Sequence, residues 1–343
     1  MSAQRSLAFS SADIDALFAS FGRAKALLVA VSGGPDSTAL LLMAAEWAKR
    51  RGKTRIEAAT VDHGLRPESA DEAKAVAALC ARLGVGHRIL QWKGAKPTTR
   101  LQERAREARY RLLVDHAKAI GADALLTAHH ADDQAETVLF RLLRGSGIAG
   151  LRGMDAVTAR DGMRIARPLM GLKKRDLIAF ADSRGAHFVD DPSNADPRFA
   201  RTRLRTLLVR LGEEGLDAEA LDRLARRARE TEEALAHLTA EVEAQADRDG
   251  ALDARALFAA PIAIAQRILT RRVAEAGGRD ASRIGLEKIE TLAADLRDAL
   301  KERRTHGANV GGAIVRLTAK GRLSFAPEPP RKGGKSERPT RSR

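Results

Sequence analysis

Residues 32–37 combine two glycines with hydroxyl and carboxyl side chains directly after an apolar run. Glycines let the backbone turn tightly and bring its N–H groups against an anion. The carboxylate of Asp36 suits a phosphate neighbour only if a cation lies between them, so we expect Asp36 to hold Mg²⁺. The segment contains no lysine and so differs from the phosphate loop of kinases and GTPases. It predicts a phosphate-binding loop, with a plain strand–turn–helix connection as the alternative. The residues expected at the nucleotide are Ser32, Gly33, Gly34, Pro35, Asp36 and Ser37.

A second polar group lies in residues 127–137, Thr-Ala-His-His-Ala-Asp-Asp-Gln-Ala-Glu-Thr. Asp133 and Glu136 are three residues apart and share one face of a helix that begins here. One acid in a first turn is an ordinary partner of the helix dipole. Two acids on one face suggest a site for a cation such as an amino-acid ammonium. His129 and His130 could instead bind a metal with these acids, although adjacent histidines do not easily converge on one ion.

Asp62 and His63 form a third group, within Val-Asp-His-Gly-Leu-Arg at residues 61–66. They follow another apolar run, so their position could shape a nucleotide pocket. The alternative is a polar turn that Gly64 closes.

Short β-rich runs alternate with helical stretches through the first half of the chain. We expect strands at residues 26–31, 55–61, 87–92 and 124–128, and helices at 38–51, 70–83, 99–120 and 132–144. Such alternation is typical of an α/β fold: a doubly wound parallel sheet with helices on both faces. Ligands of these sheets bind at the carboxyl ends of the strands, where the three polar groups lie.

The second half differs in composition. Long Ala/Arg/Glu/Leu stretches at residues 216–246 and 259–304 predict a mainly helical C-terminal domain, and residues 310–325 predict a small hairpin. We expect a helical lead-in at 1–24, the α/β domain at 25–210 with an Arg-rich linker at its end, the helical domain at 211–326, and a basic disordered tail at 327–343.

Composition restricts the class of protein. The chain has 343 residues, 44% of them hydrophobic, which suits two globular domains. Its net charge of +15 indicates a polyanionic partner such as a folded RNA, although a basic charge that only aids solubility is the alternative. The single cysteine, Cys80, excludes a disulfide framework or a Cys-rich metal site and suits a packing role in a helix. With neither a signal peptide nor an apolar run of about 20 residues, we expect a cytoplasmic protein that spans no membrane.

Residues 32–37 resemble the Ser-Gly-Gly-x-Asp-Ser loop of the PP-loop, or N-type, ATP pyrophosphatases. Further segments are similar, in order, to the tRNA(Ile)-lysidine synthases within that superfamily, and the similarity covers about residues 27–205. These segments are residues 61–66, Ala-Arg-Glu-Ala-Arg-Tyr at 105–110, residues 127–137 with 144–147 and 150–151, Arg-Pro-Leu at 167–169 and Asp-Pro-Ser-Asn at 191–194.

The resemblance implies an enzyme that joins free lysine to C2 of the wobble cytidine of an isoleucine tRNA with a CAU anticodon. It uses ATP and Mg²⁺ and passes through an adenylated cytidine. Residues 25–210 would be the ATP-binding catalytic domain and 211–326 the tRNA-binding domain, in a protein compatible with a homodimer. Asp36, Asp133 and Glu136 would be catalytic, the last two holding lysine. Arg109, Arg201 and Arg205 would contact phosphate or tRNA. Thr202 departs from the family, which commonly has Asn there.

Two alternatives remain: another PP-loop tRNA-modifying enzyme, such as a 2-thiolation enzyme, and a non-catalytic ATP-binding module that associates with RNA. Thiolation chemistry needs persulfide cysteines or an iron–sulfur cluster, which one cysteine does not suit. Residues 145–150 match the dinucleotide pattern Gly-x-Gly-x-x-Gly but follow a helix, and residues 333–336 resemble part of a Walker A loop without its first glycine. We expect neither segment to bind a nucleotide.

Overall fold

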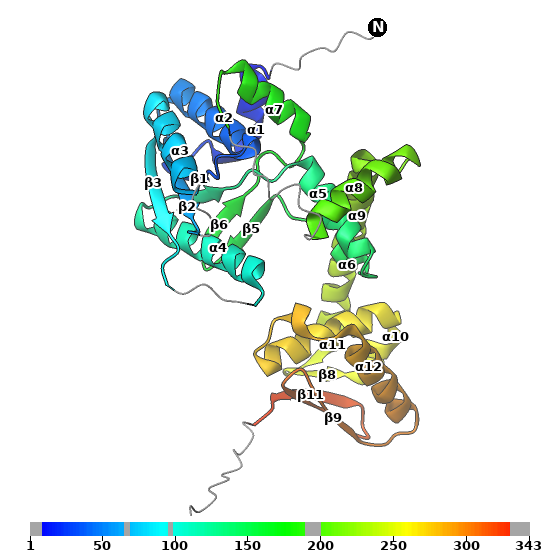
Figure 1. The fold of residues 1–343 in the computed structure, drawn as a ribbon. Coiled ribbons are helices and arrows are strands. Elements are labelled where there is room, and N and C mark those ends of the chain that lie inside the picture. Colours follow the sequence, from blue (N-terminus) through cyan, green and yellow to red (C-terminus); the bar gives the residue numbers. More distant parts are fainter. Residues whose placement is uncertain (1–8, 65–68, 95–98, 189–199, 330–343) are drawn as a thin grey trace, which may run out of the picture. The chain divides into compact units, whose positions relative to one another are not determined.

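The computed structural model of the chain describes residues 9–64, 69–94, 99–188 and 200–329 (Figure 1). The chain divides into two compact units, Met1–Arg229 and Glu230–Arg343. The division falls inside helix α9 (Ala218–Ala246) and not at the expected boundary near residue 210. The sequence-predicted tail beyond Pro329 lies outside the described residues.

Unit 1 contains a six-stranded sheet in the order β3-β2-β1-β4-β6-β5. Its strands are β1 (Ala26–Ala30), β2 (Arg55–Asp62), β3 (Gly86–Gln91), β4 (Ala124–Leu126), β5 (Val157–Arg160) and β6 (Met163–Ala166). All neighbouring strands are parallel except β5, which pairs antiparallel with β6 at the edge. The expected doubly wound α/β fold is confirmed. The β5–β6 hairpin was missed, because four-residue strands carry almost no periodicity.

Strand β1 is buried on both faces, as a central parallel strand must be. Its side chains alternate between two cores: Leu27 and Val29 join one, and Leu28 and Ala30 join the other. The first core is covered by helices α1 (Ser11–Leu17), α2 (Pro35–Arg51), α3 (Ser69–Leu83) and α7 (Lys174–Ser183), and the second by α4 (Leu101–Ala119). A short 3₁₀ helix, η1 (Ala19–Phe21), follows α1.

The order of the strands creates a switch point between β1 and β4. From β1 the chain crosses to β2 on one side, whereas β4 pairs with β1 on the other side. The connections that leave these two strands therefore run in opposite directions and leave a crevice between them. Helix α2 follows β1, and helix α5 (Ala131–Leu142) follows β4.

Helix α2 begins at Pro35, three residues before the predicted start. Gly34 is its N-cap, and Pro35 lacks the N–H that would find no partner in a first turn. Asp36 and Ser37 therefore lie in the first turn of the helix and not in the preceding loop.

The segment predicted as an Arg-rich linker contains a helix, α8 (Ala200–Glu213), which the sequence analysis did not predict. Apolar side chains of α8 pack against α5 and the first half of α9, and the buried members of this cluster are Ala135, Val138, Leu139, Leu204, Leu221 and Ala225. Because α8 is rich in arginine, its apolar residues, which recur at helical spacing, were not recognised in the sequence. A short helix, α6 (Ile148–Leu151), lies between α5 and β5.

Unit 2 combines helices with a five-stranded antiparallel sheet of order β7-β8-β11-β10-β9. Its elements are β7 (Asp247–Arg248), β8 (Ala251–Asp253), α10 (Ala254–Ala259), α11 (Ile262–Gly277), η3 (Ala281–Arg283), α12 (Leu286–Lys301), β9 (His306–Val310), β10 (Ala313–Leu317) and β11 (Arg322–Pro327). The predicted hairpin corresponds to β10 and β11, and it is one part of this larger sheet. Ile268 of α11, Leu292 of α12 and Val315 of β10 lie in one core.

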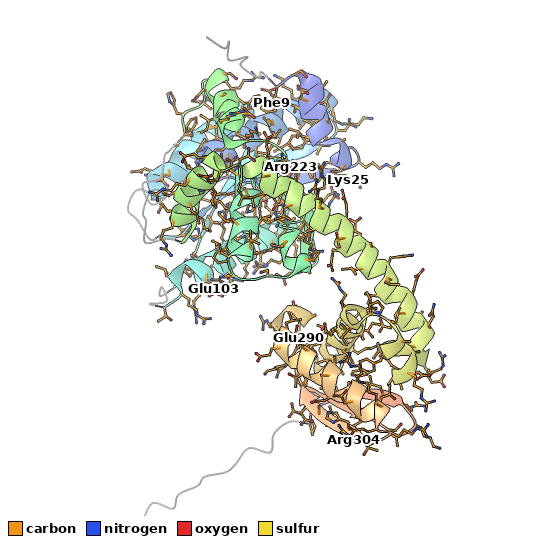
Figure 2. All side chains as sticks on the ribbon, turned by 90° about the vertical axis from the view of Figure 1, so that its right-hand side faces the viewer. Phe9, Lys25, Glu103, Arg223, Glu290 and Arg304 are labelled. Carbon is orange, nitrogen blue, oxygen red and sulfur yellow. The ribbon has the colours of Figure 1, made fainter. Side chains whose placement is uncertain are left out.

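Charged side chains are plentiful on both units, and Figure 2 shows them along helix α9. Within unit 2, Glu232 and Glu243 of α9 pair with Arg267 and Arg272 of α11. Among the helices that the structure describes, none combines the length and apolar character needed to cross a bilayer.

Leu204 is 7% exposed and anchors α8 to α5, so Leu204→Ala should lower the free energy of unfolding by about 2–5 kcal/mol. Val209 on the same helix is 69% exposed. Val209→Ala should therefore change the free energy of unfolding by about 0.5 kcal/mol or less. Urea denaturation followed by circular dichroism measures both. Equal effects of the two substitutions would contradict the packing of α8 described above.

Candidate active site

The loop between β1 and α2 is shaped by glycine geometry. Gly33 has φ of 88°, a left-handed conformation that other residues rarely adopt. Gly34 is extended, with φ of −77° and ψ of 167°, and its carbonyl accepts the Thr38 N–H at 3.1 Å. The loop thus turns sharply into the positive end of a 17-residue helix, which suits an anion.

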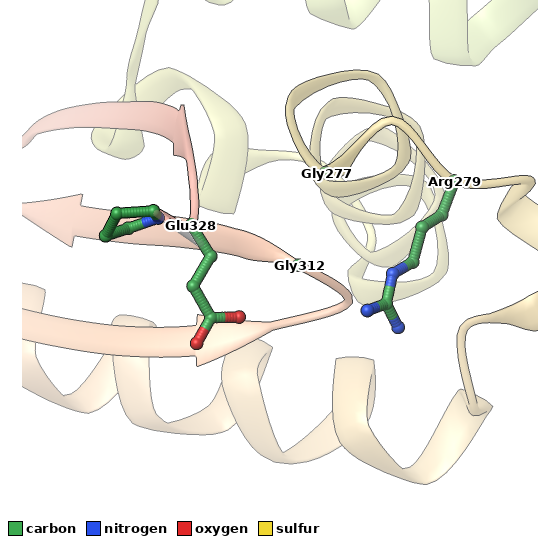
Figure 3. Close-up of a pocket in the computed structure, with 5 residues that line it drawn as sticks. Gly277, Arg279, Gly312 and Glu328 are labelled. Atoms are coloured by element: carbon green, nitrogen blue, oxygen red, sulfur yellow. The ribbon is translucent and has the colours of Figure 1, made fainter. Parts of the chain in front are cut away.

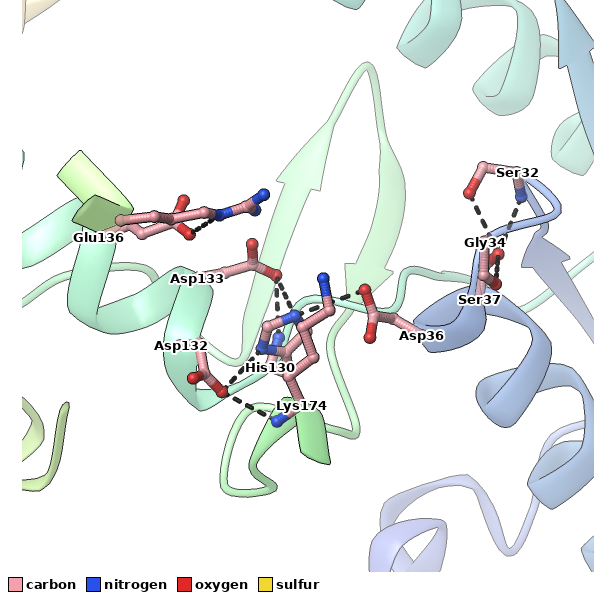
Figure 4. Close-up of polar contacts among 10 residues, drawn as sticks. Ser32, Gly34, Asp36, Ser37, His130, Asp132, Asp133, Glu136 and Lys174 are labelled. Atoms are coloured by element: carbon pink, nitrogen blue, oxygen red, sulfur yellow. Dashed lines mark hydrogen bonds and ion pairs between the residues drawn. The ribbon is translucent and has the colours of Figure 1, made fainter. Parts of the chain in front are cut away.

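Internal hydrogen bonds hold this loop. Ser37 Oγ accepts the Ser32 N–H and donates to the Gly34 carbonyl, both at 3.0 Å, and the two serine hydroxyls are 3.1 Å apart (Figure 4). Both hydroxyls therefore brace the loop in this structure. Their donation to a phosphate stays a prediction.

Helix α5 brings its acids to the same crevice. His130 is its N-cap, and the His130 N–H donates to Asp133 Oδ2 at 3.2 Å. The imidazole of His130 lies between the two helix starts: Nε2 is 3.5 Å from Asp36 Oδ2 and 3.5 Å from Asp133 Oδ2, and Nδ1 is 3.4 Å from Asp132 Oδ2 (Figure 4). Its side chain is only 2% exposed. The phosphate loop and α5 therefore meet through one buried histidine.

The protonation of this cluster follows from its charges. Burial alone would lower the pKa of His130, but the carboxylates of Asp132, Asp36 and Asp133 outweigh burial and raise it to about 10. Pairing with His130 lowers the pKa of Asp132 to about 2, against the opposing effect of its own burial. The imidazole is thus a cation at neutral pH.

Glu136 is paired with the helix that was predicted to be a linker. Its side chain is 5% exposed, and Arg205 of α8 donates through Nε to Glu136 Oε1 at 2.5 Å. Burial would lower the pKa of Arg205, but Glu136, Asp133 and Asp36 together raise it. Asp36, the pair Asp133 and Glu136, and Arg205 come from three separate segments of the sequence and form one charged group.

Two carboxylate oxygens of this group are buried without a hydrogen-bond partner among the described residues: Asp36 Oδ1 and Glu136 Oε2. Buried acceptors without donors are costly, so each suits a cation that arrives with a ligand. Oxygen is the donor that Mg²⁺ prefers, and one carboxylate together with phosphates is a usual set for it, so Asp36 fits the predicted metal. Within the described part of the chain, no three His, Cys, Asp or Glu side chains are placed to hold a metal by themselves. The alternative of a His129–His130 metal site therefore gains no support.

Other predicted residues lie outside this group. Asp62 is the last residue of β2, and its side chain accepts the Gly64 N–H and the Ser69 hydroxyl, each at 2.8 Å, so it shapes the turn that follows. The His63 ring lies edge-on to Trp92, with ring centroids 6.0 Å apart. Arg109 is half-buried on α4, the helix on the opposite face of the sheet from α2. Arg201 is the second residue of α8, and its side chain is not described.

Residues 145–150 have a structural role here. Arg141 of α5 donates to the carbonyls of Gly150 and Gly153, both at 2.7 Å. Gln134 bonds the backbone of Met154 through both ends of its amide, at 2.7 and 3.2 Å. This loop is therefore fastened to α5, in keeping with the expectation that it is no dinucleotide motif. Residues 333–336 lie outside the described residues.

An open groove of about 480 Å³ lies in unit 2, between the end of α11 and the turn joining β9 to β10 (Figure 3). It is lined by Gly277, Arg279, Gly312, Glu328 and Pro329. None of the predicted site residues belongs to it.

The sequence analysis missed two residues of the charged group. Asp132 had no assigned role, and His130 was considered only as a metal ligand. Asp132 Oδ2 also accepts the Lys174 N–H of α7 at 2.9 Å, which ties the cluster to a third helix. The signal that could have indicated this is the density of acids around an N-cap histidine.

The His130 imidazolium predicts a measurable pH response. The pKa of the His130 ring in the folded chain lies above the ordinary value of about 6.5. The ring therefore contributes fully to stability below about pH 6.5, and this contribution is lost as the pH rises through about 10. In metal-free protein, ¹⁵N NMR should show both ring nitrogens protonated at pH 8. The His130→Gln protein identifies the signal by its disappearance. A neutral ring at pH 8 would contradict the proposed charge balance.

The chain is similar to known proteins over most of its length. The PP-loop domain family matches residues 8–211. A tRNA(Ile)-lysidine synthase from Methylobacterium nodulans is 50% identical over 91% of this chain and 93% of its own length, and one from Rhodopseudomonas palustris is 46% identical over 95% and 97%. Among solved structures, a U34-tRNA thiolase from Methanococcus maripaludis is similar in fold, with a TM-score of 0.53 and 18% sequence identity. The similarity covers 62% of this chain and 77% of the thiolase. The chain therefore belongs to the tRNA(Ile)-lysidine synthase family of PP-loop proteins, which are ATP-using ligases.

Proposed function

We propose that this protein joins lysine to C2 of the wobble cytidine of an isoleucine tRNA with a CAU anticodon, at the expense of ATP. One observation carries the proposal: a phosphate loop and a pair of acids meet at the switch point, each presenting a buried carboxylate oxygen without a partner. One such oxygen suits the metal of a nucleotide, and the other suits an ammonium group. A ligase of ATP and an amino acid needs both sites side by side.

The chemistry requires two steps. The C2 carbonyl oxygen of cytidine is a poor leaving group, so it first attacks the α-phosphorus of ATP and expels pyrophosphate. An amine of lysine then attacks C2, the C2–O bond breaks, AMP leaves with the oxygen, and the amine loses a proton. When bound, Mg²⁺ would offset the charge that develops on the pyrophosphate.

Residues of the charged group divide this work. Asp36 would hold Mg²⁺, and residues 32–37 would cradle the phosphates at the start of α2. Asp133 and Glu136 would hold lysine, with Arg205 keeping the Glu136 carboxylate oriented. Asp62 and His63 would border the nucleotide.

The tRNA would contact the basic surfaces of the chain. Arg109, Arg201 and Arg205 are the candidates in unit 1, since forked guanidinium donors suit phosphate. Unit 2 would also contact the tRNA, and the net charge of +15, which belongs to the chain as a whole, favours a polyanionic partner. A cytoplasmic location and a homodimer stay predictions.

The thiolation alternative is weaker in the structure than in the sequence. Cys80 is fully buried on α3, and burial raises the pKa of its thiol to about 11. Such a thiol is a poor nucleophile and has no access to substrate. The likeness to a thiolase of low identity shows a shared fold and nothing about this reaction.

The proposal is tested with purified protein, ATP, Mg²⁺, lysine and a CAU-anticodon isoleucine tRNA. Pyrophosphate and AMP should be released, and mass spectrometry should show tRNA heavier by one lysine less one water. Without lysine, adenylated tRNA should accumulate. Asp36→Ala should release no pyrophosphate, whereas Asp182→Ala, an exposed change on α7, should act as the unaltered protein does. Sulfur incorporation, or ATP binding without turnover, would decide for an alternative function.

Glu136→Gln keeps the shape of the side chain and removes its charge. The KM for lysine should rise about tenfold to a hundredfold, because a hydrogen bond to a charged group contributes about 1.5–3 kcal/mol. Calorimetry should find ATP affinity nearly unaltered. Glu213→Gln, an exposed change on α8, is the matched control. Equal losses of lysine and ATP affinity would indicate that Glu136 only supports the structure.

A further inference from the structure

We propose that His130 is a positioning residue for the nucleotide site: its Nε2 side orients the carboxylate of Asp36, so that Asp36 presents its other oxygen to the metal of bound ATP. The inference deepens the proposed function and rests on its assignment of residues 32–37 to ATP. The same nitrogen, Nε2, also faces the carboxylate of Asp133.

The first support is the set of atoms that face the ring. Nδ1 faces Asp132, and Nε2 faces Asp36 and Asp133, all at 3.4–3.5 Å. These are ion-pair distances, and Nδ1 makes no hydrogen bond to the described residues. A ring that has a carboxylate at each edge separates acids that would otherwise repel each other.

The second support is that the two carboxylate oxygens of Asp36 have different surroundings. Oδ2 faces His130, whereas Oδ1 is buried without a partner among the described residues. A carboxylate that is held by one oxygen cannot rotate freely, and the other oxygen then has a fixed direction. Fixed ligand geometry is what neighbouring groups of a metal ligand normally provide.

The third support is the anchoring of the ring itself. Asp132 Oδ2 faces Nδ1 and also accepts the Lys174 N–H at 2.9 Å. A continuous series of contacts therefore runs from the start of α7 through Asp132 and His130 to Asp36 at the start of α2 (Figure 4). Three helix starts are held together by one ring that is 2% exposed.

The charge of the group agrees with this role. Four carboxylates, those of Asp36, Asp132, Asp133 and Glu136, face two basic side chains, those of His130 and Arg205. The group thus keeps an excess of negative charge, which favours a metal ion and an ammonium group. With His130 absent, the carboxylates would repel one another, and nothing in the described chain would fix the direction of Asp36.

The test uses two neutral replacements that imitate different ring nitrogens. The amide nitrogen of His130→Gln can reach the place of Nε2 and donate to Asp36, whereas that of His130→Asn reaches only the place of Nδ1, toward Asp132. Titration calorimetry measures ATP affinity at saturating Mg²⁺ and again with EDTA, and thermal melting measures stability. The unaltered protein is the reference.

With Mg²⁺, His130→Asn should weaken ATP binding at least about tenfold, because losing a group that orients a metal ligand typically costs about 10- to 100-fold in metal affinity. His130→Gln should retain most of the ATP affinity. In EDTA the two variants should bind ATP about equally, and their melting temperatures should be similar. Equal affinity of the two variants with Mg²⁺, or losses that follow their melting temperatures, would overturn the positioning role.

ATP binding does not depend on the transfer of lysine, so the two proposals fail separately. Unaltered protein that binds Mg²⁺–ATP but makes no lysidine would overturn the proposed function, while the Gln–Asn comparison would still decide the role of His130. Unaltered protein that binds no ATP would overturn both.

Discussion

A buried cation among carboxylates is the interaction on which the site depends. Removing charges from water costs several kcal/mol for each ion, and good geometry and partners must offset that cost. Here the imidazolium of His130 touches three carboxylates while it is almost completely buried. The acids can stay ionised close together because this cation lies between them, and only ionised acids can attract a metal ion or an ammonium group.

The parallel sheet explains why these groups meet at all. Residues 32–37 and residues 127–137 are about 100 positions apart, but each follows a strand, and β1 and β4 are neighbours in the sheet. Because the chain leaves these strands in opposite directions, the starts of α2 and α5 face the same crevice. Both helices also bring the positive ends of their dipoles there, which favours phosphate groups and the acids themselves.

Helix α8 adds a group that the sheet cannot supply. Its apolar side packs on α5 through Leu204, and Arg205, the next residue, pairs with Glu136 of α5. A contact made for packing thus also sets the charge beside the proposed lysine site.

Local sequence determined much of this protein. Short β-rich runs that alternate with helical stretches indicated strands β1 to β4, and the order of short motifs indicated the family, because loop chemistry and strand patterns are local properties. The glycine loop made Asp36 a candidate site residue, and helical spacing did the same for Asp133 and Glu136; their roles stay predictions. Only the tertiary structure decided that His130 is a cation and that residues 200–213 are a packed helix. It also decided that Arg205 pairs with Glu136 while Arg109 lies elsewhere. Those outcomes depend on burial and on contacts between distant segments, which set protonation and pairing and leave no trace in local spacing.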